Sequence, residues 1–170
     1  IFDIMFINLH FINILVNDID SNAVRNLGLG VKVCSKDEIY CNADLISLHV
    51  PLTKDTHNMV SLDQINKMKK SVYLINTSRG GIINEESLLD ALKSDRISGA
   101  AVDTYEEEPY FGGLVKLNNC INTAHMGSMT VGCRSAMEIE ATQEAIRFIK
   151  GEALLSEVPE DEYRVQSHNL

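Results

Sequence analysis

The stretch Ser71-Val72-Tyr73-Leu74-Ile75-Asn76-Thr77-Ser78-Arg79-Gly80-Gly81 decides the fold, because an apolar run typical of a β-strand passes directly into a polar turn. The pattern recurs twice: residues 97–103 lead into Tyr105-Glu106-Glu107-Glu108-Pro109, and residues 119–123 lead into Ala124-His125-Met126-Gly127-Ser128. In an open parallel sheet, ligands bind in the crevice beyond the carboxyl ends of the strands. We therefore expect Arg79, Glu108 and His125 to meet at one edge of a sheet.

Further apolar runs alternate with segments of helical character, which predicts strand–helix–strand units and a parallel sheet. The other expected strands cover residues 12–17, 31–34 and 44–50. The expected helices cover residues 21–27, 36–42, 61–70 and 130–150, together with one that Asn84 caps. Ser61 and Gln64 have the spacing of a capping box, and Gly151 is a typical helix stop. This order of elements predicts an α/β domain followed by a polar tail.

Composition narrows the class of function. A chain of 170 residues that is 45% hydrophobic is long enough for one domain with a sizeable core. Its formal charge of -9 and its lack of a Lys/Arg cluster argue against nucleic acid or an anionic membrane surface as a partner. No apolar run approaches the length of a membrane span. Small-molecule chemistry therefore fits best.

The cysteines and the first residues indicate the cellular context. Cys34, Cys41, Cys120 and Cys133 have neither the paired spacing of a zinc site nor the density of a disulfide scaffold. We therefore expect no metal site and reduced cysteines in a cytoplasmic protein. The chain begins at Ile1 rather than at methionine, and it lacks the basic start and cleavage site of a signal peptide. These features predict a fragment of a longer cytoplasmic protein.

Four motifs resemble, in order, those of the nucleotide-binding domain of the D-isomer-specific 2-hydroxyacid dehydrogenases, including phosphoglycerate dehydrogenase. They are His49-Val50-Pro51-Leu52-Thr53, Asn76-Thr77-Ser78-Arg79-Gly80-Gly81, Gly99-Ala100-Ala101-Val102-Asp103 with Glu108-Pro109 after it, and Thr123-Ala124-His125-Met126-Gly127-Ser128. The resemblance implies a truncated Rossmann-type doubly wound parallel sheet with NAD as cofactor. It also implies interconversion of a small D-2-hydroxy acid and a 2-oxo acid.

The resemblance implies three catalytic roles. Arg79 would bind the substrate carboxylate and polarise the keto oxygen, His125 would donate the proton during reduction, and Glu108 would hold His125 and favour its protonated form. Chemistry supports these roles, because hydride addition to a ketone leaves an alkoxide that needs a proton donor and a nearby cation. Taken singly, each residue also has an ordinary explanation: a turn, a solvated acidic loop or a surface histidine.

Cofactor residues are also implied. Asp18 follows the strand expected at residues 12–17, where dinucleotide-binding folds place an acid that hydrogen-bonds the ribose diol and repels the extra phosphate of NADP. NAD is therefore favoured, although Asp20 is an alternative ligand and Asp18 could simply form a turn. By resemblance, Val50 and Pro51 would contact the adenosine side. The residues expected near the nicotinamide are Thr77, Ser78, Arg79, Asp103, His125, Gly127 and Ser128.

The sequence also departs from the family. The glycine-rich fingerprint that seats the pyrophosphate should precede the ribose acid by about 20 residues. Only 17 residues precede Asp18, and none is glycine. Ala124 stands where the family usually has proline. We therefore expect residues 1–151 to form a partial NAD-binding domain without its first strand–helix unit, and residues 152–170 to be a tail or a remnant of the substrate domain.

Three interpretations remain open at this point. The first is an enzyme sequence whose complete form, expected to be a homodimer, acts on a 2-hydroxy acid. The second is a catalytically silent protein of the family's corepressor type, which senses NAD and binds partners. The third is a truncated product without a function of its own.

Overall fold

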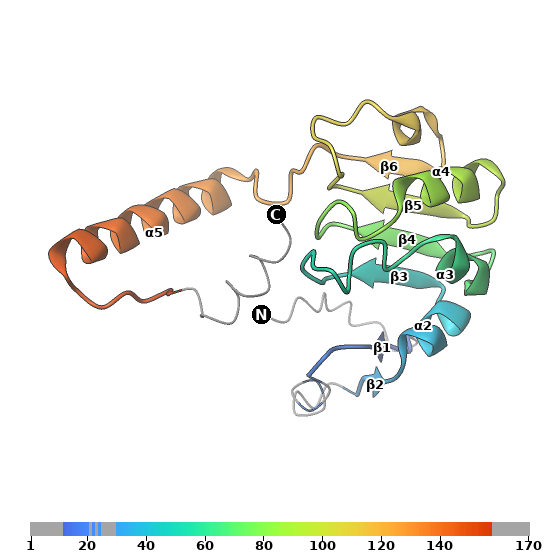
Figure 1. Ribbon diagram of the computed structural model, residues 1–170, viewed down its shortest axis with the longest axis horizontal. Helices are drawn as coiled ribbons and strands as arrows, with labels where there is room; N and C mark the ends of the chain where they lie inside the picture. Colours follow the sequence, from blue (N-terminus) through green and yellow to red (C-terminus); the bar gives the residue numbers. More distant parts are fainter. Residues whose placement is uncertain (1–11, 21, 23, 25–29, 158–170) are drawn as a thin grey trace.

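The computed structural model describes residues 12–20, 22, 24 and 30–157, and its centre is a four-stranded parallel sheet (Figure 1). The strands, in sheet order, are β3 (Leu45–Leu48), β4 (Tyr73–Asn76), β5 (Gly99–Val102) and β6 (Cys120–Asn122). Their last residues are in register, since Leu48 pairs with Asn76, Asn76 with Val102 and Val102 with Asn122. The segments that leave the carboxyl ends of the strands therefore start side by side, as predicted.

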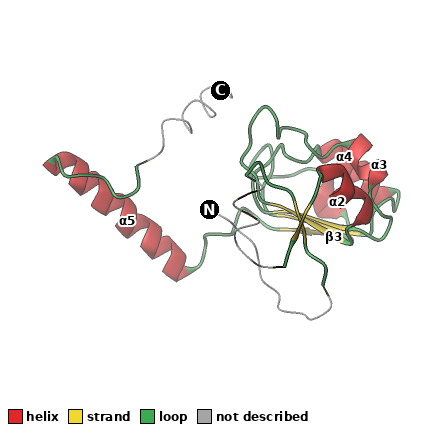
Figure 2. Cartoon of the chain, turned by 90° about the horizontal axis from the view of Figure 1, so that it is seen from below, coloured by secondary structure: helices red, strands yellow, loops and turns green. Residues whose placement is uncertain are grey.

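Three helices lie on one side of this sheet (Figure 2): α2 (Lys36–Asn42), α3 (Leu62–Lys67) and α4 (Glu85–Lys93). Burial alternates along β3, where Ile46 and Leu48 are buried and Leu45 and Ser47 are exposed. Leu74 of β4 and Leu88 of α4 belong to the same core. Alternate residues of the strands are buried on one face of the sheet, and the apolar face of α4 packs against that face.

The other side of the sheet is more open. The side chains of Leu45, Tyr73 and Ile121 are 56%, 54% and 69% exposed, and their neighbours along each strand are buried or partly buried. The ring of Tyr73 lies close to Gly99, since a Cβ added to Gly99 would be 3.1 Å from Cε1 of that ring.

The predicted helices form with one difference among the described residues. Ser35, Asn84 and Thr130 cap their helices through side-chain oxygens, as their residue types favour. The helix expected to reach Lys70 ends at Lys67, because the backbone turns extended at Met68, whose side chain is buried, and Arg96 Nη2 donates to the carbonyl of Met68 at 2.9 Å. The helix expected at residues 21–27 lies largely outside the described residues.

A second, two-stranded parallel sheet comprises β1 (Leu15–Val16) and β2 (Lys32–Val33). Both strands are shorter than the predicted runs at residues 12–17 and 31–34. Lys32 of β2 forms an ion pair with Glu38 of α2, which connects this sheet to the rest of the fold.

The longest helix, α5 (Val131–Lys150), extends away from the sheet (Figure 1) and contains no buried residue. It ends at Gly151, which has the left-handed φ of 69° typical of a helix stop. Within the described ranges, no helix combines the length and apolar composition that crossing a membrane requires. The same ranges contain no group of three potential metal-ligating side chains.

Candidate active site

The structure brings Arg79, Glu108 and His125 together at the carboxyl edge of the four-stranded sheet. All three line one open cleft of about 390 Å³. The full lining is Leu52, His57, Arg79, Gly80, Gly81, Thr104, Tyr105, Glu106, Glu108 and His125. The cleft therefore gathers a cation, two carboxylates and two imidazoles from the segments that follow β3, β4, β5 and β6.

Glu108 and His125 form an ion pair, with Nδ1 of the imidazole 3.0 Å from Oε2 of the carboxylate. The other carboxylate oxygen accepts the backbone N–H of Tyr105 at 3.1 Å. The Tyr105 N–H, followed by the contact with His125, lowers the pKa of Glu108 from its ordinary value. Glu108 therefore stays ionised beside the imidazole.

Asp103 holds the turn that carries His125. One of its carboxylate oxygens accepts the Thr123 hydroxyl and the Met126 N–H, and the other accepts the Gly127 N–H at 3.2 Å. Its own carbonyl accepts the His125 N–H at 2.8 Å. Burial alone would raise the pKa of Asp103, but these hydrogen bonds outweigh it, so the pKa is lowered. His125 has a φ of 51°, a left-handed conformation that this set of bonds stabilises.

The Arg79 turn is fixed by two neighbours in sequence. Asn76, buried at the end of β4, donates from Nδ2 to the carbonyl of Arg79 at 2.8 Å and accepts the Ser78 N–H at 3.1 Å. The Ser78 hydroxyl donates to the carbonyl of Leu48, so the turn is also tied to β3. The side chain of Arg79 is exposed, and its guanidinium Nη1 donates to the carbonyl of Ser78 in the same turn at 2.7 Å.

The Arg79 turn and the Glu108 turn touch through their backbones at Gly80. A Cβ added to Gly80 would lie 2.0 Å from both the carbonyl carbon and oxygen of Tyr105, and 2.5 Å from the nitrogen of Glu106. Only glycine permits such an approach. The backbones of the two turns that carry Arg79 and Glu108 are therefore in direct contact.

The residues expected to contact NAD are spread along the carboxyl edges of both sheets. Val50 and Pro51 follow β3, Thr77 and Ser78 follow β4, and Gly127 and Ser128 follow His125. Asp18 follows β1 and is exposed, and its Oδ1 accepts the Asp20 N–H at 2.7 Å. The carboxylate thus forms the local turn that was an alternative explanation for it.

Two features near His125 and the cleft leave room for a ligand. A Cβ on Gly127 would meet only Asp103 Oδ2, at 3.7 Å, so the backbone there is open to a ligand. The buried Thr104 hydroxyl beside the cleft has no hydrogen-bond partner among the described residues, and it can serve a bound polar group. The described residues contain no glycine-rich turn for a pyrophosphate.

His57 and Thr104 of the cleft lie outside every motif quoted from the sequence, and Leu52 lies within one but was given no role. Leu52 and His57 lie in the segment between β3 and α3, and both reach the cleft above Gly81, where an added Cβ would be 3.4 Å from His57 Cδ2 and 3.5 Å from Leu52 Cδ1. Their position after the end of β3 is the signal that could have identified them, since segments after parallel strands line the ligand crevice.

Comparison with known proteins identifies the family of this chain. Residues 9–127 match the family model described as D-isomer specific 2-hydroxyacid dehydrogenase, NAD binding domain. The chain belongs to this family of NAD-binding domains, which confirms the resemblance, the Rossmann-type fold class and the family's cofactor, NAD.

Individual relatives give the extent of the similarity. The chain is 40% identical to glyoxylate reductase of Thermococcus litoralis over 73% of the chain and 38% of that protein. It is 37% identical to D-3-phosphoglycerate dehydrogenase of Bacillus subtilis over 76% of the chain and 25% of that protein. An NAD-complexed D-isomer specific 2-hydroxyacid dehydrogenase from Lactobacillus delbrueckii superposes with a TM-score of 0.76 at 29% identity, covering 86% of this chain and 48% of that one. The chain thus spans less than half the length of each of these proteins.

Proposed function

We propose that this chain is the nucleotide-binding part of an NAD-dependent oxidoreductase that interconverts a small D-2-hydroxy acid and a 2-oxo acid. The observation that carries the proposal is the Glu108–His125 ion pair, 3.0 Å long, in the same cleft as Arg79. A proton donor held by a carboxylate, beside a cation that stays charged, suits the reduction of a ketone that carries a carboxylate.

Each side chain has a distinct task in this mechanism. Arg79 binds the substrate carboxylate through its planar fork and stabilises the negative charge that develops on the keto oxygen. Because Nδ1 of His125 faces Glu108, Nε2 is the ring nitrogen that can reach the substrate. During reduction Nε2 gives its proton to the keto oxygen, which becomes the hydroxyl, and Glu108 balances the imidazolium before the transfer. When bound, reduced NAD supplies the hydride that the carbonyl carbon receives.

We assign the cofactor contacts by the position of residues at the sheet edges. Asp18 is proposed to hydrogen-bond the adenosine ribose, with Val50 and Pro51 beside the adenosine. The proposed nicotinamide end comprises Thr77, Ser78, Arg79, Asp103, His125, Gly127 and Ser128. Asp103 acts there mainly through the turn of His125, because both of its carboxylate oxygens accept hydrogen bonds from that turn or its strand.

The cellular setting belongs to the same proposal. The four cysteines are free thiols in the structure, which agrees with a reducing compartment such as the cytoplasm. We propose that the complete protein acts as a homodimer on soluble small acids, without nucleic acid or membrane partners.

The test is a chimera in which this chain replaces the matching part of the Thermococcus litoralis glyoxylate reductase. We expect NADH-dependent reduction of a 2-oxo acid, and His125→Gln should lower turnover by about 10²- to 10⁴-fold because the proton donor is lost. Glu108→Gln should move the alkaline fall of kcat/KM to lower pH, whereas the exposed neighbour variant Glu107→Gln should leave the profile in place. A folded chimera without reductase activity, or superimposable profiles for Glu108→Gln and its parent, would contradict the proposal.

A further inference from the structure

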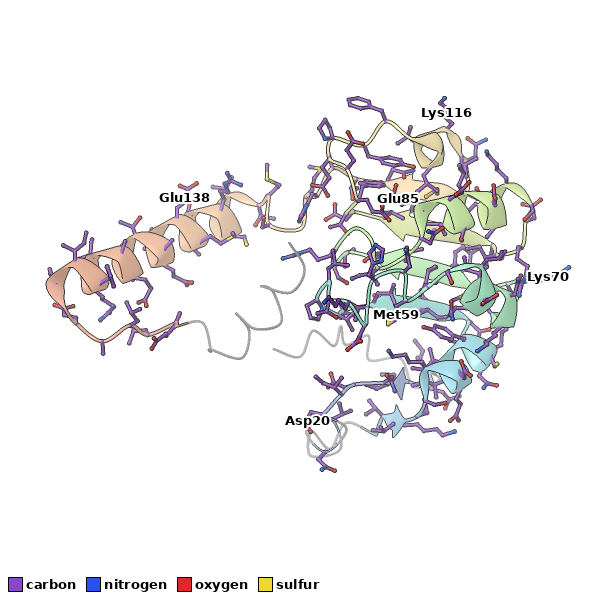
Figure 3. All side chains as sticks on the ribbon, in the orientation of Figure 1. Asp20, Met59, Lys70, Glu85, Lys116 and Glu138 are labelled. Atoms are coloured by element: carbon purple, nitrogen blue, oxygen red, sulfur yellow. The ribbon has the colours of Figure 1, made fainter. Side chains whose placement is uncertain are left out.

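The turn that carries Glu108 is held by a side chain from a neighbouring helix. Oε1 of Glu85 accepts the backbone N–H of Glu106 at 2.8 Å. Glu85 is the first residue of α4, which starts shortly after the Arg79 turn, and Figure 3 shows it at the beginning of that helix. One hydrogen bond thus joins the unit that carries Arg79 to the turn that carries Glu108.

This bond acts on the amide next to the one that binds Glu108. The Tyr105 N–H donates to Glu108 Oε1 at 3.1 Å, and the Glu106 N–H, one peptide further along, donates to Glu85. The two N–H directions depend on each other, because only the φ and ψ of Tyr105 separate the two peptide planes. Releasing the Glu106 N–H would therefore change the aim of the Tyr105 N–H, and with it the position of Glu108.

We propose that Glu85 is a positioning residue for the Glu108–His125 pair. It holds the Glu106 N–H, and so fixes the direction in which Tyr105 presents its N–H to Glu108. The catalytic meaning of this role rests on the proposed function, whereas the contact itself does not. Backbone packing at Gly80 restrains the distance between the two turns, and Glu85 restrains the orientation of the second.

The ordinary role of an acidic residue at the start of a helix does not explain the placement of Glu85. Glu86, in the same first turn, is exposed and meets the positive end of the helix dipole in solvent. Glu85 is half-buried, and burial raises its pKa, as does the nearby Glu106 carboxylate, while the Glu106 N–H lowers it. After burial, the charge of Glu85 also helps to raise the pKa of Tyr105 and of Tyr110. Burying a carboxylate near a like charge costs free energy unless the carboxylate is hydrogen-bonded, and the Glu106 N–H supplies that hydrogen bond.

The experiment measures the titration of the Glu108 side-chain carboxyl by ¹³C NMR in the full chain. Glu85→Asp keeps the charge but shortens the side chain by one methylene, so it should release the Glu106 N–H and raise the pKa of Glu108 toward its ordinary value. Glu85→Gln keeps both the length and an acceptor oxygen, so Glu108 should titrate as in the parent. Glu86→Asp is the matched control on the same helical turn and should also leave Glu108 unchanged.

Several results would overturn the proposal. One is a parent-like Glu108 titration in folded Glu85→Asp; others are an equal rise in Glu86→Asp or an equal rise in Glu85→Gln. If Glu85→Asp fails to fold, the hydrogen bond is read in the parent chain as a scalar coupling between the Glu106 nitrogen and the Glu85 carboxyl carbon, and its absence would refute the contact. None of these readouts requires cofactor, substrate or turnover, so they stand or fall separately from the proposed reaction.

Discussion

Replacing Gly80 by alanine should separate the Arg79 turn from the Glu108 turn. The new Cβ would lie 2.0 Å from the carbonyl carbon of Tyr105, whereas ordinary contact begins at 3.4 Å, so the two backbones must part by about 1.4 Å, the difference between these distances. Forcing extra atoms into a packed site costs about 1 to 3 kcal/mol. We expect a cost near 3 kcal/mol, since backbone lies on both sides of the collision and no flexible side chain can yield.

Urea unfolding followed by near-ultraviolet circular dichroism measures this cost. The stacked rings of Tyr105 and Tyr110, with centroids 4.2 Å apart, report directly on the turn that must move. With a urea slope of about 2 kcal/mol per molar, a loss of about 3 kcal/mol lowers the midpoint by about 1.5 M. Gly132→Ala is the control, because its Cβ meets nothing within 4 Å and should not lower the midpoint. A Gly80→Ala midpoint within about 0.3 M of the parent would show that the turns are not in backbone contact.

Three further changes test other parts of the site. Asp103→Asn should lower the free energy of unfolding by about 1 to 3 kcal/mol at neutral pH, because the charged hydrogen bonds to the His125 turn are weakened. The pKa of Asp103 is lower in the folded than in the unfolded protein, so its contribution to stability is present above the unfolded pKa and is lost as the pH falls below about 4. The unfolding free energies of parent and variant should therefore converge at low pH. A difference that does not change with pH would contradict this role of the Asp103 carboxylate. Burial raises the pKa of Tyr105 to about 12, so in an alkaline absorbance titration one phenol should ionise near that pH, and Tyr105→Phe should remove that step. Because the folded pKa is raised, the stability that Tyr105 contributes should fall between about pH 10 and 12. In the glyoxylate reductase chimera, Asp18→Ala should narrow the preference of kcat/KM for NADH over NADPH, and an unchanged ratio would mean that Asp18 is not the ribose ligand.

The meeting of Arg79, Glu108 and His125 was predictable because it follows from topology. Parallel strands in register place their following segments at one edge, so a sequence reader needs only the order of strands and the polar residues after them. The pairing of Glu108 with His125 came from the family resemblance, and the 3.0 Å contact agrees with it. The assignment of NAD contacts stays a prediction.

Other features depend on distances that sequence patterns do not encode. In the sequence, Asp103 is an acidic residue at the end of an expected strand, like several others. The fold shows that its carboxylate accepts N–H groups from residues 23 and 24 positions away. Likewise the contact from Glu85 to Glu106 spans 21 positions. The early end of α3 also required the structure, since it depends on Arg96, 28 positions from the carbonyl of Met68 that it caps. Local propensity does not carry such long-range bonds.

The exposure of α5 divides the molecule into two thermodynamic regimes. An isolated helix of about 20 residues is marginal in water, and its i,i+4 pair of Arg134 and Glu138 adds only about 0.2 to 0.5 kcal/mol. With no buried residue, α5 draws little free energy from the cooperative unit that the sheet forms with α2, α3 and α4. Warming should therefore unwind α5 gradually, with the broad melting and rapid amide exchange of a peptide, while the sheet and its cleft unfold in a single sharp transition at higher temperature.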